Sequence, residues 1–290
     1  MESKIKPTPC PDVNDILHLL LRNVSDILKD NLVGMYLFGS LANGDFDSHS
    51  DIDVLFVTGK VISEESFHAL FEMHEKISAM ESAWSDQLEV SYIPRVALHH
   101  FDPSNNRHPH LDRGREGRLF VMQHDADWIV QRYLLYKRGI TVTGPEPQTL
   151  IAPLSSADLR WAGSNILHTW FRSFLEDPGK LKSRGYQSYT VLTLCRILYT
   201  DGNGEIASKP AAAEWAKRNL GSEWTALIDQ AVLGRQTPGL EASPEDIRGT
   251  LDLIRFTLEH IKPDKAKNPS HDLVIDKRFS IDTQPSHKLS

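Results

Sequence analysis

The sequence predicts an α+β fold, in which an N-terminal α/β domain precedes an all-α helical domain. Three observations support this prediction. Through the first half of the chain, short apolar runs of strand length alternate with helical patterns of apolar residues. The second half repeats helix-start signals and contains no strand-like run. The length of 290 residues suits about two domains of roughly 150 residues each.

The elements of the first half follow from the spacing of its apolar residues. Residues 12–30 place Ile, Leu and Val side chains on one face at helical spacing, which predicts an amphipathic helix. By the same reasoning we expect strands at 33–38, 52–57, 88–93 and 140–143, and further helices at 63–80 and 123–138. Residues 94–118 are rich in Pro, His, Asn, Arg and Gly without an apolar period, so a long surface loop is expected there.

The second half begins after residues 144–147, where Gly and Pro interrupt regular structure, and serines that can cap a first turn mark its helices. The expected caps are Ser155 or Ser156, Ser208, Ser222 and Ser243. Residues 191–198 are apolar on nearly every side, as in a helix at the middle of a bundle. The polar composition from residue 263 onward predicts a flexible tail. The predicted domains are therefore 1–150 and 151–262, followed by the tail 263–290.

The composition argues against several classes of protein. The formal charge of −7, from 32 Lys and Arg against 39 Asp and Glu, disfavours nonspecific binding of nucleic acid. The chain has no run of about 18 apolar residues that could span a membrane, and its first residues lack the apolar stretch of a secretion signal. Two cysteines, Cys10 and Cys195, are too few for a disulfide framework. We therefore expect a cytoplasmic protein that binds neither nucleic acid nor membranes.

The feature most informative about chemistry is the run MYLFGSLANGDFDSHSDIDVLFV at residues 35–57. Asp51 and Asp53 open a strand, and because alternate residues of a strand face the same side, both carboxylates point one way. Two such carboxylates repel each other, and a divalent cation such as Mg²⁺ relieves the repulsion. Gly39 and Ser40 end the preceding strand, where a tight turn presents backbone N–H groups and a hydroxyl to phosphate oxygens.

A third acid, Glu89, lies between two apolar residues in the next predicted strand. If it faces the same metal, it can be a third ligand or can take a proton from an attacking hydroxyl. Taken singly, each element has an ordinary interpretation, since a lone DxD pair on a strand edge is more often a solvated turn. Their order and spacing together favour a site for a metal and a polyphosphate.

The pattern of GS, ten residues, SDIDVLFV and then LEV resembles the catalytic signature of the nucleotidyltransferase superfamily related to DNA polymerase β. Residues 187–216, QSYTVLTLCRILYTDGNGEIASKPAAAEWA, resemble the helical domain of the aminoglycoside (3'')(9) adenylyltransferases. The resemblance implies a nucleotidyltransferase domain with a mixed sheet, followed by a helical bundle. It also implies that Asp51 and Asp53 bind metal, that Glu89 is the catalytic base, and that the contacts of ATP include Ser40, Ser50, Arg196 and Lys209. From the residues themselves we expect Gly39 to bind ATP as well and Glu89 to be a further metal ligand.

Two of these residues also have alternative interpretations. Arg196 lies in an otherwise apolar helix and needs an anionic partner, which could be phosphate or a core acid such as Glu214. Lys209 starts a helix, where the helix dipole does not favour a cation, although it could be a solvated surface lysine. The chain departs from the family at Tyr186, which stands where the family has an acid that helps hold the antibiotic. The chain also has no tryptophan in 94–118, the segment in which the family has a tryptophan that stacks on the drug.

Other charged residues of the 94–118 segment are interpreted as solvated. The basic stretch could close over phosphates, but a wet surface loop is the favoured interpretation for Arg107, Arg113, Arg115 and Arg118. The histidines of this segment are interpreted in the same way, because no ligand spacing supports a zinc site there.

The function expected from the resemblance is transfer of AMP from ATP, with two Mg²⁺ ions, to a hydroxyl of a small cationic molecule. An aminoglycoside or aminocyclitol of the streptomycin or spectinomycin type is the first expectation, and the protein is expected to be a monomer. One alternative is a nucleotidyltransferase that modifies a protein or tRNA acceptor, as in toxin–antitoxin systems. Another is a nucleotide-binding regulator without catalytic activity.

Overall fold

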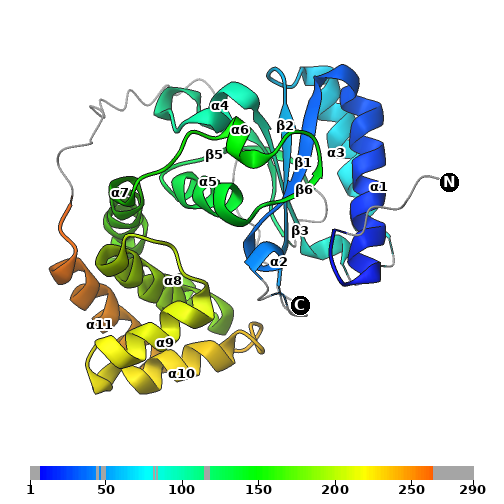
Figure 1. Ribbon diagram of the computed structural model, residues 1–290. Coiled ribbons are helices and arrows are strands. Elements are labelled where there is room, and N and C mark those ends of the chain that lie inside the picture. The colour runs from blue at the N-terminus through cyan, green and yellow to red at the C-terminus, as the bar shows by residue number, and fades with distance from the viewer. Residues whose placement is uncertain are drawn as a thin grey trace.

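The computed structural model describes residues 7–43, 46, 50–80, 82, 84–113 and 118–263, and every structural statement below concerns these residues. A six-stranded sheet with covering helices forms the N-terminal part of the chain, and a group of helices follows it (Figure 1). The predicted fold class is therefore confirmed. Apart from its first residue, the tail predicted at 263–290 lies outside the described residues. In the described ranges, no helix combines the length and the apolar character needed to cross a membrane.

The sheet is mixed. Its strands are β1 (Leu32–Leu37), β2 (Ile52–Thr58), β3 (Leu88–Pro94), β4 (Arg107–Leu111), β5 (Phe120–Gln123) and β6 (Ile140–Thr143). They lie in the order β5-β4-β3-β2-β1-β6. Only the central pair β2 and β3 runs parallel; the other neighbouring strands are antiparallel. The first, second, third and last of these strands correspond to the four strands predicted from apolar runs.

One face of the sheet is covered by α1 (Pro11–Leu28) and α3 (Glu64–Ser78). The strands alternate, so that in β2 the side chains of Ile52, Val54 and Phe56 belong to the core beneath these two helices. Leu55 and Val57 point to the other face, with a second core. By the same alternation, the acidic residue between Ile52 and Val54 faces away from α1 and α3.

The opposite face is covered by α4 (Arg95–His99), α5 (Asp127–Arg138) and α6 (Pro147–Leu150). The buried guanidinium of Arg132 on α5 donates to the carbonyl oxygen of Leu98 at 2.8 Å, and the hydroxyl of Tyr36 donates to the carbonyl oxygen of Pro145 at 2.7 Å. These bonds satisfy polar groups that the packing of this layer removes from water.

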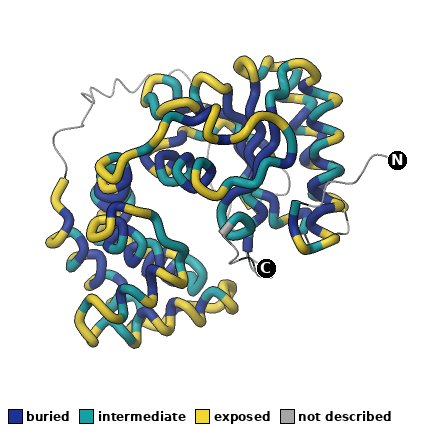
Figure 2. Tube along the Cα trace, viewed as in Figure 1, coloured by how far each residue is buried: buried dark blue, intermediate teal, exposed yellow. Residues whose placement is uncertain are grey.

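The C-terminal helices surround α8 (Arg184–Asn203). They are α7 (Ser156–Ile166), α9 (Lys209–Asn219), α10 (Thr225–Gly234) and α11 (Pro244–His260). Side chains of α8 contribute more to the buried core of this group than those of any other helix, as the all-round apolar pattern of 191–198 predicts. Figure 2 shows this burial along α8 and along the central strands. Figure 1 places these helices on the side of the sheet that carries α5.

Several expected helix starts are confirmed, and one is wrong. Ser155, Ser208 and Ser243 each accept a backbone N–H at the start of α7, α9 and α11. Ser222 does not cap α10, because a short 3-10 turn at Ser222–Trp224 precedes the helix.

The prediction of a long surface loop at 94–118 is also wrong. This segment contains α4 and β4, and β4 pairs with β3 on one side and β5 on the other. The inward residues of β4 are His108 and His110, which are 4% and 3% exposed and pack against the ring of His124. Burial lowers the pKa of His124 to about 2, so its ring is neutral and packs against Trp128 at 4.5 Å. Imidazole rings therefore occupy core positions that a search for apolar residues does not detect, and the expectation of solvated histidines fails for this pair.

Candidate active site

Gly39 lies where β1 leads into α2 (Gly39–Asn43), and its backbone conformation explains why a glycine is needed at this position. Its φ is +63°, a left-handed conformation, and a Cβ atom at this position would lie 1.8 Å from the Oδ2 atom of Asp53. The backbone thus approaches the aspartate closely enough for the N–H of Ser40 to hydrogen-bond to its carboxylate. The hydroxyl oxygen of Ser40 is buried and has no hydrogen-bond partner among the described residues, which is costly unless a ligand supplies one.

The parallel register of β2 and β3 brings the predicted acids together. Asp53 is the direct register partner of Glu89, and Asp51 immediately precedes β2. Burial, followed by the charge of Asp51, raises the pKa of Asp53 to about 7. Burial, followed by the charge of Asp53, raises the pKa of Glu89 to about 8. The sheet therefore holds three carboxylates whose mutual repulsion favours a proton or a cation among them.

This donor set fits a hard divalent cation such as Mg²⁺, because carboxylate oxygens are its preferred protein ligands. As they stand, however, no three His, Cys, Asp or Glu side chains in the described ranges are placed so that they could hold a metal ion together. Asp51 is instead paired with Arg113, whose Nη1 atom lies 2.6 Å from its Oδ1 atom. Arg113 is exposed, as a solvated residue is expected to be, but the turn after β4 also brings this cation to the carboxylates.

The helical domain contributes positive charge from the opposite side. Lys209 is the first residue of α9, and its Nζ atom lies 4.7 Å from the ring centroid of Tyr189 on α8. Burial, followed by the charges of Arg196 and Arg235, lowers the pKa of Lys209 to about 8. The charges of Lys209 and Arg196 in turn lower the pKa of Asp53, so the two sets of charges act on each other across the domains.

The alternative interpretations of these cations can now be compared with the structure. Glu214, the core acid considered for Arg196, pairs with Lys217 on its own helix, the Nζ and Oε1 atoms lying 2.6 Å apart. Lys209 is not a solvated surface lysine, because it lines a cleft against Tyr189. Tyr186, which departs from the family pattern, packs in an aromatic cluster with Trp170, with ring centroids 6.1 Å apart.

All eight residues predicted for the site line one cleft between the sheet and the helical domain, with a volume of about 330 Å³. They are Gly39, Ser40, Ser50, Asp51, Asp53, Glu89, Arg196 and Lys209. Their functional roles remain predictions. Residues of the lining that sequence reasoning missed include Gln131, Tyr189, Arg235 and Pro238. They lie on α5, on α8 and after α10, and no local motif connects these segments to the acids.

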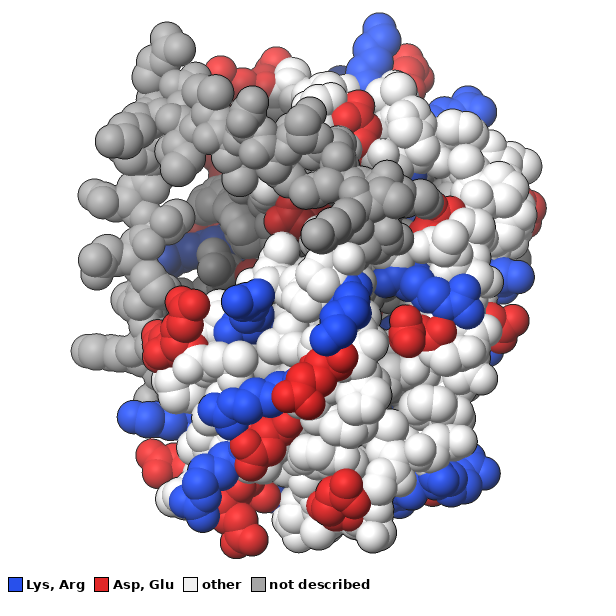
Figure 3. All heavy atoms as spheres, turned by 90° about the vertical axis from the view of Figure 1, so that its left-hand side faces the viewer, with Lys and Arg blue, Asp and Glu red and all other residues white. Residues whose placement is uncertain are grey.

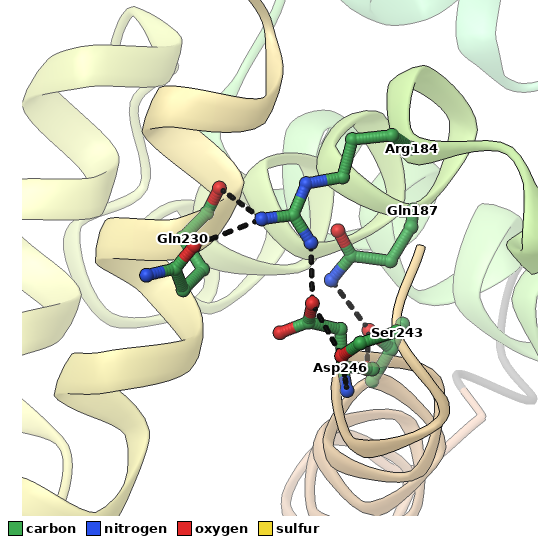
Figure 4. Close-up of polar contacts among 6 residues, drawn as sticks. Arg184, Gln187, Gln230, Ser243 and Asp246 are labelled. Carbon is green, nitrogen blue, oxygen red and sulfur yellow. Dashed lines mark hydrogen bonds and ion pairs between the residues drawn. The ribbon is translucent and has the colours of Figure 1, made fainter. Parts of the chain in front are cut away.

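A polar network fixes the start of α8, which carries part of the cleft wall. Figure 4 shows Arg184 between Asp246 of α11 and Gln230 of α10, with Arg184 ion-paired to Asp246. Gln187 donates from its side-chain amide to the hydroxyl of Thr250 at 2.9 Å, within the buried interior. These contacts join three helices at one point, so the cleft wall on α8 has a defined position relative to α10 and α11.

The same end of α8 also holds the segment that follows α10. The backbone N–H of Gly185 donates to the carbonyl oxygen of Pro238 at 3.1 Å, and that of Arg184 donates to Leu240 at 2.8 Å. A Cβ atom on Gly185 would lie 2.8 Å from Pro238, so the two backbones approach as closely as a glycine permits. This segment thereby brings Arg235 and Pro238 to the cleft.

The chain matches known proteins in both of its parts. Residues 21–108 match the nucleotidyltransferase domain family, and residues 149–252 match the aminoglycoside adenylyltransferase C-terminal domain family. A spectinomycin 9-adenylyltransferase of Staphylococcus aureus is 29% identical over 221 residues, covering 74% of this chain and 82% of that protein. An aminoglycoside (3'')(9) adenylyltransferase of Escherichia coli is 26% identical over 243 residues, covering 79% and 88%.

A solved structure has the same fold. The crystal structure of a spectinomycin adenyltransferase from Enterococcus faecialis with ATP and spectinomycin matches with a TM-score of 0.65 and 17% identity, covering 84% of this chain and 98% of that one. The order of the two matched domains along the chain is the order in which the sheet and the helical bundle follow each other. The chain therefore carries a nucleotidyltransferase domain followed by an aminoglycoside adenylyltransferase C-terminal domain, and the protein is an enzyme of the nucleotidyltransferase class.

Proposed function

We propose that this protein transfers AMP from ATP to a hydroxyl group of a small aminoglycoside or aminocyclitol, in a Mg²⁺-dependent reaction. The observation that carries the proposal is the meeting of three sheet carboxylates with Arg196 and Lys209 across one cleft. Arg196 and Lys209 complement the negative charge of a polyphosphate, and the carboxylates complement the divalent cation that accompanies it. The names of the relatives, which are spectinomycin or aminoglycoside adenylyltransferases, support the class of acceptor.

The phosphates of ATP are proposed to bind between the turn after β1 and the helical domain. The backbone N–H groups and the orphaned hydroxyl of Ser40, with Ser50, provide hydrogen-bond donors on the sheet side. Arg196 and Lys209 provide positive charge on the other side, where Lys209 is held over the ring of Tyr189. Burial makes these charges more effective than they would be in open water.

The proposed ligands for Mg²⁺ are Asp51, Asp53 and Glu89, whose oxygens and shared negative charge suit two such ions. Bound divalent ions in such sites stabilise the charge on the attacking and leaving oxygens. Arg113 contacts the Oδ1 atom of Asp51, so its guanidinium lies beside the proposed metal ligands and lines the cleft that the phosphates would share.

Glu89 is the proposed general base. Its raised pKa makes it a stronger base than an ordinary carboxylate, provided that the neighbouring cations keep it ionised. It takes the proton of the acceptor hydroxyl, and the oxygen attacks the α-phosphorus of ATP. The new oxygen–phosphorus bond forms as the bond to the bridging oxygen of the β-phosphate breaks, and pyrophosphate leaves. Arg196 and Lys209 hold the phosphates for this in-line displacement.

The decisive experiment measures pyrophosphate release with ATP and a panel of aminoglycosides that includes spectinomycin and streptomycin. Glu89→Gln is expected to lower turnover by about 10²- to 10⁴-fold, because it removes the proton acceptor, and to leave the Kd for ATP nearly unchanged. Glu64→Gln, at a 93% exposed side chain on α3, is the matched control and should keep wild-type turnover. Near-native turnover of Glu89→Gln would show that Glu89 is not the base.

A labelling experiment, together with the pyrophosphate assay, distinguishes the alternative functions. Incubation with labelled ATP and cell extract would place label on protein or RNA if the acceptor were a macromolecule. On the face shown in Figure 3, positive and negative side chains are interspersed, whereas RNA binding relies on clustered positive charge. A regulator without catalytic activity would bind ATP and release no pyrophosphate with any acceptor.

A further inference from the structure

A second cavity adjoins the nucleotide cleft. It has a volume of about 360 Å³ and lies between α5, α7 and α8. Gln131, Tyr189 and Arg196 line both spaces, so the cavity and the cleft share a wall. The size is that of a small-molecule site. Trp170 and Tyr189, whose ring centroids are 5.6 Å apart, provide aromatic surface beside several aliphatic side chains.

The carboxylate of Asp127, the first residue of α5, lines this cavity. Asp127 is exposed, and its side chain opens into the cavity. Partial desolvation by the protein around it, followed by the charge of Asp125, raises the pKa of its carboxyl to about 6. Within the described residues, no Lys, Arg or His side chain lies within ion-pair distance of Asp127. Its stabilisation comes from backbone N–H groups at the start of the helix. A carboxylate in such surroundings gains from a cation that enters the cavity.

Asp125 lines the same cavity but is already engaged. Its Oδ1 atom accepts from the side-chain amide of Gln123 at 2.8 Å and from that of Asn106 at 3.5 Å. The two acids, two residues apart, are therefore not equivalent. Asp125 accepts from two side-chain amides, whereas the partners of Asp127 are backbone N–H groups and its carboxylate lines the cavity.

Tyr189 connects this cavity with the proposed chemistry. Desolvation raises the pKa of its hydroxyl, the charge of Arg196 lowers it, and the charges of Asp127 and Glu89 raise it further, so both carboxylates act on this hydroxyl. More than a third of Tyr189, 37%, is exposed, and this surface faces the two spaces that it lines. A molecule bound in the cavity therefore contacts the wall formed by Tyr189, and Glu89, the proposed base, lies on the other side of this wall.

We propose that Asp127 is a specificity-determining residue that binds a protonated amine of the acceptor, with the cavity beside it holding the acceptor's ring system. This inference rests on the proposed function and names the contact by which a cationic acceptor is recognised. The aromatic and aliphatic side chains of the cavity pack against the rings of the acceptor. The reacting hydroxyl of the acceptor then faces Glu89, past the wall at Tyr189 that the cavity shares with the cleft. The chemical class is a small polyhydroxylated amine, positively charged at neutral pH.

The test compares wild type with Asp127→Asn, Asp127→Glu and Asp125→Asn, using whichever member of the panel the wild type adenylylates. For Asp127→Asn the KM for the acceptor is expected to rise about 10- to 100-fold, as for loss of a charge-assisted hydrogen bond, while the KM for ATP stays within about threefold. Asp127→Glu should recover part of the affinity. Asp125→Asn removes the same charge nearby and should raise the acceptor KM by less than threefold.

A change in the acceptor, in place of a change in Asp127, gives an independent test on the wild-type enzyme that does not depend on the folding of a variant. The same acceptor with its amines N-acetylated has lost the positive charge of those amines, and its KM should rise by about the same factor with wild type. With Asp127→Asn the two forms of the acceptor should differ by less than threefold. The thermal midpoint of Asp127→Asn, compared with wild type, confirms that the variant is folded.

Each outcome decides between the two proposals. If wild type adenylylates a member of the panel and Asp127→Asn keeps the acceptor KM, or if wild type does not discriminate against the acetylated form, the assignment of Asp127 is overturned and the proposed function stands. If wild type adenylylates none of the amines, the proposed function is overturned, and the role of Asp127 in acceptor binding is overturned with it.

Discussion

Substitution of Gly39 by alanine tests the architecture of the site most directly. The positive φ of +63° costs an alanine about 1 to 2 kcal/mol in the left-handed region. In addition, the new Cβ would lie 1.8 Å from Oδ2 of Asp53, so the carboxylate must retreat by about 1.2 Å to reach even 3.0 Å. A displacement of this size in a reacting group costs about 10²-fold in rate. We therefore expect Gly39→Ala to lose about 100-fold in kcat/KM and to unfold at a temperature roughly 2 to 8 °C lower.

Pyrophosphate release measures the activity of this variant, and circular dichroism during heating measures its stability. Gly202→Ala is the matched control, because a Cβ on Gly202 would make only an ordinary 3.6 Å contact with Trp215. That control should keep wild-type kcat/KM. If Gly39→Ala retained activity within threefold of wild type, the close approach of the turn to Asp53 would have no functional importance, and the reasoning would be wrong.

Two further predictions concern single contacts. Tyr189→Leu removes the ring beneath Lys209 and should raise the KM for ATP by about 3- to 10-fold, whereas Tyr189→Phe should not; equal effects of both variants would exclude the ring contact as the cause. Burial lowers the pKa of His74 to about 3 from about 6.5, so its contribution to stability is complete above pH 6.5 and is lost as the pH falls toward 3. In urea denaturation between pH 6 and 4, the free energy of unfolding of wild type should therefore fall about 1.4 kcal/mol per pH unit more steeply than that of His74→Gln. Parallel slopes would mean that His74 is not buried in its neutral form.

Much of the fold could be predicted from short segments. Buried strands such as β2 are continuous apolar runs, and α8 is apolar on nearly every side, so their environment is visible in the residues themselves. The acids at the start of β2 could be placed on one face because a strand repeats every two residues. Their proximity to Glu89 needed only one further assumption, that β3 lies beside β2, and the register confirms it.

Other features could not be predicted, because they depend on residues that are far apart in the sequence. β4 was missed because its core positions are occupied by His108 and His110, whose neutrality is a consequence of burial and not of residue type. Arg113 was interpreted as solvated because the chain between β3 and β5 gives no local sign that its turn reaches Asp51.

The sequence by itself determined which local structures form, including the glycine turn after β1. It also determined which charged residues these structures carry: the paired aspartates at the start of β2 and the cations on α8 and α9. These depend on periodicity and on side-chain chemistry within a few residues. Only the tertiary structure decided that the carboxylates of the sheet and the cations of the bundle face one cleft, and that Asp127 opens into a cavity beside it. The physical reason is that a charge acquires its function from its partners and its burial, and both are set by the packing of the helical domain against the α5 side of the sheet.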